Sequence, residues 1–181
     1  MSECPPCTPD EIICCTPKTL PDNMWISAAD VAGKENPANR PSLIGLPPGV
    51  LVPQHIALIT SKWWGSAGVK LGVTFLDNPN QATRKLILAH MNAWNQWANV
   101  ILTDSAQGQV RIARANDGYW SYLGTDERSI PARQATMNLQ GFTEKTAESE
   151  YKRVVRHETG HTLGCPHEHQ RSAIVANIDP A

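Results

Sequence analysis

The chain has 181 residues, 41% of them hydrophobic, and a formal net charge of −1. This is ordinary globular composition for one domain, or one domain with an extension, and it gives no electrostatic basis for binding nucleic acid or an anionic membrane. No apolar run approaches the roughly 20 residues that a membrane span needs. The start of the chain has neither the basic segment nor the apolar segment of a secretory signal, so the sequence alone leaves the cellular location open.

The first 60 residues differ in composition from the rest of the chain. Prolines interrupt them repeatedly, and four of the five cysteines fall within the first fifteen positions. We expect residues 1–60 to form a Cys- and Pro-rich extension and residues 61–181 to form the main domain. The four cysteines could pair locally, bind a second metal, supply a thiol to a site elsewhere, or remain reduced in an irregular tail. They are Cys4, Cys7, Cys14 and Cys15.

Helices and a first strand are expected in the order of the chain. Residues 21–33 and 53–65 each predict a short helix, the second with Pro53 in its first turn and Gly65 beyond its end. Residues 69–76 alternate and are rich in β-formers, which predicts a strand. A longer helix follows, for which Asn78 and Pro79 predict the N-cap and first turn. Its expected apolar face contains Ala82, Leu86, Ala89, Ala93, Trp94 and Trp97.

Further strands and a last helix complete the expected fold. Residues 100–105 and 109–115 predict two strands around a short Ala-Gln-Gly connection, and residues 118–125 and 135–142 predict two more. Residues 146–164 predict a helix that ends at Gly164. This order of elements predicts an α+β domain with a mixed sheet.

Three histidines lie at fixed offsets at the end of this last helix. His157 and His161 are four residues apart, so they share one helix face. Gly164 tolerates the left-handed backbone of a sharp turn, after which His167 can supply a third imidazole. Three neutral histidines leave one position of a tetrahedral Zn²⁺ open, as in catalytic zinc sites.

Glu158 lies between the first two histidines and is the candidate general base. Zinc lowers the pKa of the water in its open position towards about 7, and a neighbouring carboxylate can accept the proton. The same residues also suit a zinc site without catalysis, or a helix that carries surface histidines. The full spacing, with Gly164 and His167 included, favours a metal site.

The histidine segment resembles that of a known family. The pattern H-E-x-x-H-x-x-G-x-x-H is the metzincin zinc-peptidase signature. Glu168, directly after the third histidine, and Arg171, three residues later, resemble the astacin-type ending. Residues 118–125 resemble the astacin segment that contains Ser-x-x-Gly, and residues 84–97 resemble the first long helix. The resemblance runs from Lys70 to Arg171, and we identify the chain as an astacin-like metzincin.

This resemblance implies a zinc metalloendopeptidase with a metzincin-like catalytic domain, a twisted mixed sheet of about five strands and two long helices. Glu158 would activate the zinc-bound water and pass its proton to the leaving amine. Protein or peptide substrates would pair with the edge strand of the sheet through main-chain hydrogen bonds. The resemblance also suggests an extracellular location, whereas the oligomeric state is not indicated. The substrate edge would contain Trp120, Ser121, Tyr122 and Leu123.

The chain departs from the family pattern after the zinc helix. Metzincins carry a Met-containing turn beneath the zinc, well downstream of the third histidine, but the last methionine here is Met137. The astacin tyrosine near that turn is missing too, because the last tyrosine is Tyr151. We therefore expect the C-terminal subdomain to be absent, with residues 61–181 forming the upper, N-terminal subdomain.

Two other interpretations remain open at this point. The chain could bind zinc and a peptide without cleaving it, in which case Glu158 would have no role as a base. Alternatively, the chain could be a latent precursor whose residues 1–60 cover the cleft like a propeptide. A thiolate is a good zinc ligand, so Cys4, Cys7, Cys14 or Cys15 could act as the latency switch.

Overall fold

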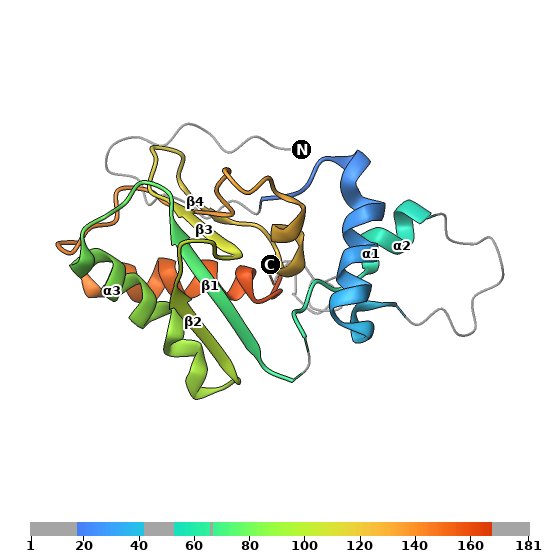
Figure 1. Ribbon diagram of the computed structural model, residues 1–181, viewed down its shortest axis with the longest axis horizontal. Helices are drawn as coiled ribbons and strands as arrows, with labels where there is room; N and C mark the ends of the chain where they lie inside the picture. The colour runs from blue at the N-terminus through green and yellow to red at the C-terminus, as the bar shows by residue number, and fades with distance from the viewer. Residues whose placement is uncertain (1–17, 42–52, 66, 168–181) are drawn as a thin grey trace, which may run out of the picture.

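The computed structural model describes residues 18–41, 53–65 and 67–167. A five-stranded sheet forms its centre, and in the view of Figure 1 α3 lies to the left of the sheet and a pair of helices, α1 and α2, to the right. None of the described helices is long and apolar enough to cross a bilayer. The described part of the chain therefore confirms the expected α+β fold with a mixed sheet.

The strand order of the sheet is β2-β1-β3-β5-β4. The first four strands in this order run parallel to their neighbours, and β4 pairs antiparallel with β5 at one edge. Each strand is short, and the expected strand regions all contain one. The bounds are β1 Val69–Phe75, β2 Val100–Asp104, β3 Val110–Ala113, β4 Tyr119–Ser121 and β5 Met137–Leu139.

The two strands on either side of the Ala-Gln-Gly connection are not neighbours. The register pairs Val69 with Val100, on one side of β1, and Val73 with Val110, on the other side. The chain between β2 and β3 therefore passes from one side of β1 to the other. The short connection is therefore a crossover and not a hairpin turn, because β2 and β3 both run parallel to β1.

Two helical segments cover one face of the sheet. The first is α3 Gln81–Met91, which continues as the 3₁₀ turn η3 Asn92–Gln96. The second runs through α4 Glu148–Glu150, the π-helical turn η5 Tyr151–Val155 and α5 Arg156–Thr162. The buried side chains of these helical segments pack against buried side chains of the strands in one hydrophobic core. Burial of such apolar surface is the largest favourable contribution to the free energy of folding. Examples are Leu71, Val73, Ile87, Met91, Ile112, Tyr151 and Val155.

The start and buried face of α3 differ from the expectation. Asn80, not Asn78, is the N-cap, and its side chain accepts a 2.9 Å hydrogen bond from the Thr83 amide. Asn78 instead adopts a φ of 49°, a left-handed conformation that asparagine tolerates in turns. The expected apolar face is wrong because Ala82 and Ala89 are exposed. The buried face contains Thr83, Ile87 and Met91.

The described part of the N-terminal extension forms a helical unit packed on the main domain. It contains η1 Asp22–Met24, α1 Trp25–Glu35 and η2 Pro37–Asn39, and α2 Pro53–Ile59 lies beside α1 (Figure 1). The Asn39 side chain bonds to both the amide and the carbonyl of Trp63, at 2.9 and 2.7 Å. The Asn36 side-chain amide donates to the Trp64 carbonyl at 2.8 Å. These side chains tie the extension to the segment that precedes β1.

Candidate metal centre

The three histidines of the signature converge at the end of α5. The Nε2 atom of His167 lies 3.1 Å from Nε2 of His157 and 2.9 Å from Nε2 of His161. One nitrogen from each ring lies within 4.8 Å of the other two. His157 is exposed, His161 is buried and His167 is half-buried, so the cluster lies at the surface of the described domain.

The turn after α5 brings His167 back to the other two histidines. Gly164 has a φ of 99°, which glycine adopts without steric cost. The Gly164 amide donates to the His161 carbonyl at 2.8 Å, and the Cys165 amide donates to the Gly160 carbonyl at 2.9 Å. This pair of bonds is a Schellman motif, which confirms that the helix ends at Gly164.

A hydrogen bond fixes the orientation of the His161 ring. Its Nδ1 atom lies 2.8 Å from the Cys165 carbonyl, which can only accept, so Nδ1 carries the proton and Nε2 keeps its lone pair. Burial lowers the pKa of His161, although the bond to Cys165 acts in the opposite direction. The ring is therefore biased towards the neutral form that metal ligation requires.

The donor set fits a single zinc ion. Zinc takes imidazole nitrogens at about 2.0–2.1 Å, so two such nitrogens in a tetrahedral arrangement lie about 3.3 Å apart. The two separations between Nε2 atoms, 3.1 and 2.9 Å, are within a few tenths of an ångström of this spacing. Three neutral nitrogens would leave a fourth position for substrate chemistry.

Glu158 lies one residue after His157 on α5 and is fully buried. Its position between His157 and His161, within the same turn of α5, is suitable for a general base. The side chains expected to do the chemistry therefore share one helical turn and its return loop.

Two tryptophans hold α5 in place. The Trp94 indole donates to the Arg156 carbonyl at 2.9 Å, and a Cβ on Gly160 would lie 3.1 Å from the Trp94 ring. The Trp64 indole donates to the Thr162 carbonyl at 2.7 Å. Sequence reasoning placed Trp94 on an apolar face and gave no role to Trp64, because neither bond is local in the chain.

The expected substrate edge lies next to α5. Strand β4 is at the edge of the sheet, and the hydroxyl oxygens of Ser121 and Thr162 are 3.0 Å apart. Trp120 and Ser121 are buried, whereas Tyr122 and Leu123 are partly exposed. A β-bridge joins Tyr122 to Lys18 of the extension, and the Lys18 ammonium lies 4.5 Å from the centre of the Trp120 ring.

Some candidate residues lie outside the described residues. These are the possible latency thiols, Cys4, Cys7, Cys14 and Cys15, together with Glu168 and Arg171 of the family-like ending. Their roles stay predictions.

Comparisons with known proteins match this site to one family. The model of the astacin peptidase family matches residues 57–176. One solved structure of myroilysin is 33% identical, with a TM-score of 0.55, and the match covers 60% of this chain and 53% of that chain. A crystal structure of myroilysin is 26% identical, with a TM-score of 0.52 and coverages of 70% and 54%. This chain spans about half the length of each, and no curated protein matches it.

Proposed function

The chain belongs to the astacin family of peptidases, and from this premise we propose that it is a zinc-dependent endopeptidase of protein or peptide substrates. The observation that carries the proposal is the convergence of three imidazole Nε2 atoms within a segment that the family model matches. His157, His161 and His167 would hold the zinc. We assign residues 61–181 to the N-terminal subdomain of the catalytic domain, and residues 1–60 to a propeptide-like extension.

Zinc, when bound, supplies a Lewis acid that polarises the scissile carbonyl and lowers the pKa of water. Glu158 would accept the proton from the attacking water and then give it to the leaving amine. The hydrogen bond from His161 to the Cys165 carbonyl would keep the ring aimed at the metal, as bonds to the far nitrogen of a ligand histidine do in zinc sites.

The peptide substrate would bind along β4. An edge strand offers main-chain donors and acceptors on its open side, and an extended peptide can pair with them as an added strand. Trp120, Ser121, Tyr122 and Leu123 would line this part of the cleft. The position of β4 at the sheet edge, next to α5, supports the assignment.

Metal removal tests the proposed function. We expect the purified chain to bind about one zinc per molecule at the His₃ site and to cleave unstructured casein. A chelator should stop cleavage, and added zinc should restore it. Cleavage and zinc content should be measured on the same samples, with a His157→Ala/His161→Ala variant as the control that cannot assemble the site. One bound zinc without cleavage would instead favour a zinc-dependent peptide-binding module.

A latent form of the same enzyme is the second candidate, and one observation favours it. Lys18 forms a parallel bridge to Tyr122, the residue directly after β4, in the segment where substrate would pair. The extension is further anchored by an ion pair of 2.8 Å between Glu35 and Arg128. A bound extension at this edge would compete with substrate for the same main-chain groups.

Release of the extension is expected to raise activity if the chain is latent. A specific protease site inserted between Pro41 and Pro53 would allow residues 1–41 to be cut off and separated after folding. Cleavage of a peptide substrate should then increase, and re-addition of the released fragment should inhibit it.

Replacing Cys4, Cys7, Cys14 and Cys15 by serine one at a time tests the thiol switch, since loss of the acting thiol should raise basal activity. Equal activity before and after release, and in all four variants, would contradict latency.

A further inference from the structure

The segment that precedes β1 lies between the extension and the last turn of α5. It comprises residues 61–64, and its two tryptophans contact that turn. The Trp64 indole, on a side chain that is only 4% exposed, donates to the Thr162 carbonyl at 2.7 Å. A Cβ on Gly164 would lie 2.8 Å from the Trp63 ring, so this ring packs directly against the glycine of the Schellman motif.

The bond from Trp64 satisfies a carbonyl that the helix itself cannot satisfy. Thr162 is the last residue of α5 and is completely buried. The residue four positions later is Pro166, which has no amide proton to donate back to it. Carbonyls at a helix end need a partner from elsewhere when water cannot reach them. Trp64 supplies that partner, so its placement affects how α5 ends.

One side of residues 61–64 is held by the 3₁₀ segment η4 Gly124–Ser129. The Thr125 amide donates to the Lys62 carbonyl at 2.9 Å. The Lys62 ammonium also pairs with the Asp126 carboxylate at 3.2 Å, and both side chains are largely buried. This side therefore fixes Lys62, which comes directly before the two tryptophans.

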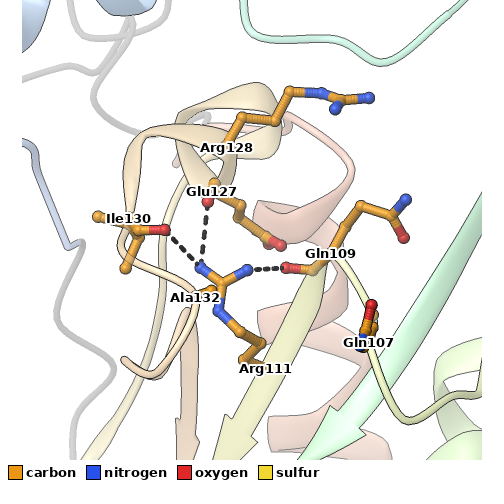
Figure 2. Close-up of a pocket in the computed structure, with 8 residues that line it drawn as sticks. Gln107, Gln109, Arg111, Glu127, Arg128, Ile130 and Ala132 are labelled. Atoms are coloured by element: carbon orange, nitrogen blue, oxygen red, sulfur yellow. Dashed lines mark hydrogen bonds between the residues drawn. The ribbon is translucent and has the colours of Figure 1, made fainter.

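Arg111 keeps η4 in place. Its guanidinium donates to the carbonyls of Glu127 and Ile130 at 3.2 and 3.0 Å, as Figure 2 shows. It also donates to the Gln109 and Gln134 carbonyls, both at 2.8 Å, so one rigid planar group connects η4 with the residue before β3 and with the segment before β5. Glu127 is only 1% exposed, so this part of η4 lies inside the protein. The element that holds Lys62 is thus itself firmly held.

The extension holds the main chain of the two tryptophans. The Asn39 side chain accepts from the Trp63 amide at 2.9 Å and donates to the Trp63 carbonyl at 2.7 Å. The Asn36 side chain donates to the Trp64 carbonyl at 2.8 Å, and the Ser61 amide donates to the Asn39 carbonyl at 3.1 Å. Both asparagines are buried, so water does not compete for these bonds. The residues that contact the turn of α5 are therefore the residues whose backbone the extension binds.

We propose that Asn36 and Asn39 are positioning residues for the metal centre, which hold Trp63 and Trp64 against the last turn of α5 and so set where the ligand histidines lie. The extension is then part of the scaffold of the site and not only a cover over its edge strand. The role at the metal rests on the proposed function, but the effect on the turn can be measured without metal. Loss of groups that orient metal ligands lowers metal affinity by about 10- to 100-fold.

The scaffold contacts are separate from the contact that would block substrate. Lys18 bridges to Tyr122 after β4, whereas the two asparagines bind residues 61–64. Release of the extension would remove both kinds of contact at once. Substitution of Asn36 or Asn39 in the full-length chain leaves the bridge of Lys18 in place and tests the scaffold role alone.

Asn138 provides a matched control for Asn39. Each asparagine is 1% exposed, and each side chain makes three hydrogen bonds to main-chain groups. Those of Asn138 go to Ala115 and Gly118, in the loop before β4. Asn138→Ala therefore removes the same kind of buried contact from a different part of the domain.

Hydrogen exchange in the metal-free full-length chain tests the effect on the turn. Asn39→Ala should speed exchange of the Gly164 and Cys165 amides about ten-fold, because these amides close the turn that rests on the tryptophan segment. The amides of α3 should be unchanged, and Asn138→Ala should leave both turn amides at the wild-type rate. Wild-type rates in Asn39→Ala, or the same increase in Asn39→Ala and Asn138→Ala, would overturn the proposal.

Asn36→Ala is the milder variant and decides the question if Asn39→Ala does not fold. It loses one bond to residues 61–64, so it should speed exchange of the turn amides about three-fold. Trp64→Phe keeps a ring but removes the N–H that reaches Thr162, and should speed exchange at least as much. The double variant should match Trp64→Phe alone, because both changes break one connection. Additive effects would contradict the route through Trp64.

Metal binding provides the second readout. Asn39→Ala should weaken zinc binding about 10-fold or more and should change the visible absorption of the Co²⁺-substituted protein, whereas Asn138→Ala should do neither. If the wild type binds no zinc, the proposed function fails, while the exchange data still decide whether the extension sets the turn. Full zinc affinity and an unchanged Co²⁺ spectrum in Asn39→Ala would refute the positioning role.

Discussion

Glu158→Gln is expected to abolish turnover while zinc stays bound. The amide has the shape of the carboxyl group but cannot accept a proton, and the loss of a general base costs about 10²- to 10⁴-fold in rate. Because Glu158 is buried, a neutral side chain of the same size should not disturb the packing of α5. The test is kcat on a peptide substrate, measured together with zinc content.

The control for this substitution is Glu144→Gln, which removes a carboxylate that accepts hydrogen bonds from Asn80 and Thr83 at the start of α3 and is not part of α5. It should leave kcat unchanged. If Glu158→Gln retains wild-type turnover, Glu158 is not the base. A different result would be that the wild type binds zinc and peptide, but neither the wild type nor Glu158→Gln cleaves the peptide. This result would favour the peptide-binding interpretation, because a binding module needs no base.

Gly124→Ala is expected to lower the free energy of unfolding strongly. Gly124 has a φ of 47°, and an added Cβ would run into the Lys62 carbonyl oxygen and lie 3.1 Å from the Gly164 Cα. The Lys62 carbonyl also accepts the Thr125 amide at 2.9 Å, so it cannot move away without loss of that bond. The left-handed conformation costs about 1–2 kcal/mol for a residue with a Cβ, and overpacking adds about 1–3 kcal/mol.

Gly141→Ala is the matched control for the steric part of this cost. Gly141 also has a positive φ, 67°, but a Cβ there would meet no atom within 4 Å. It should therefore show only the conformational cost, about 1–2 kcal/mol. Urea unfolding of the metal-free proteins measures both. Equal losses in the two variants would show that contact between the Gly124 turn and the Lys62 backbone does not limit stability.

The convergence of the three histidines was the most predictable part of the structure, because the sequence pattern that produces it is local. The four-residue spacing of His157 and His161 follows from helix geometry, and Gly164 ends the helix through its own backbone preference. The convergence of His167 depends only on that turn. The fold class followed from the order of helical and strand patterns, and similarity to the two myroilysin structures confirms the metzincin-like fold that the resemblance implied.

The parts that sequence reasoning missed depend on contacts between distant segments. Ala82 and Ala89 fit a helical period, but alanine is small enough to lie on either face, so the buried side of α3 was misassigned. The placement of β1 between β2 and β3 depends on pairing between segments far apart in the chain, which a local pattern does not contain. Glu127 lies in a charged stretch that suggests a solvent-exposed loop, and only its neighbours in space bury it.

The edge position of β4 also affects solubility. An uncovered edge strand is a template for pairing with another polypeptide, and proteins commonly protect such edges with charge or with a covering segment. Here Lys18 supplies both, through its bridge to Tyr122 and its ammonium over Trp120. The main-chain groups that would accept a substrate are the same groups through which two copies of a shortened chain would aggregate. We therefore expect the segment that contains Lys18 to limit self-association of the folded protein for as long as it stays in place.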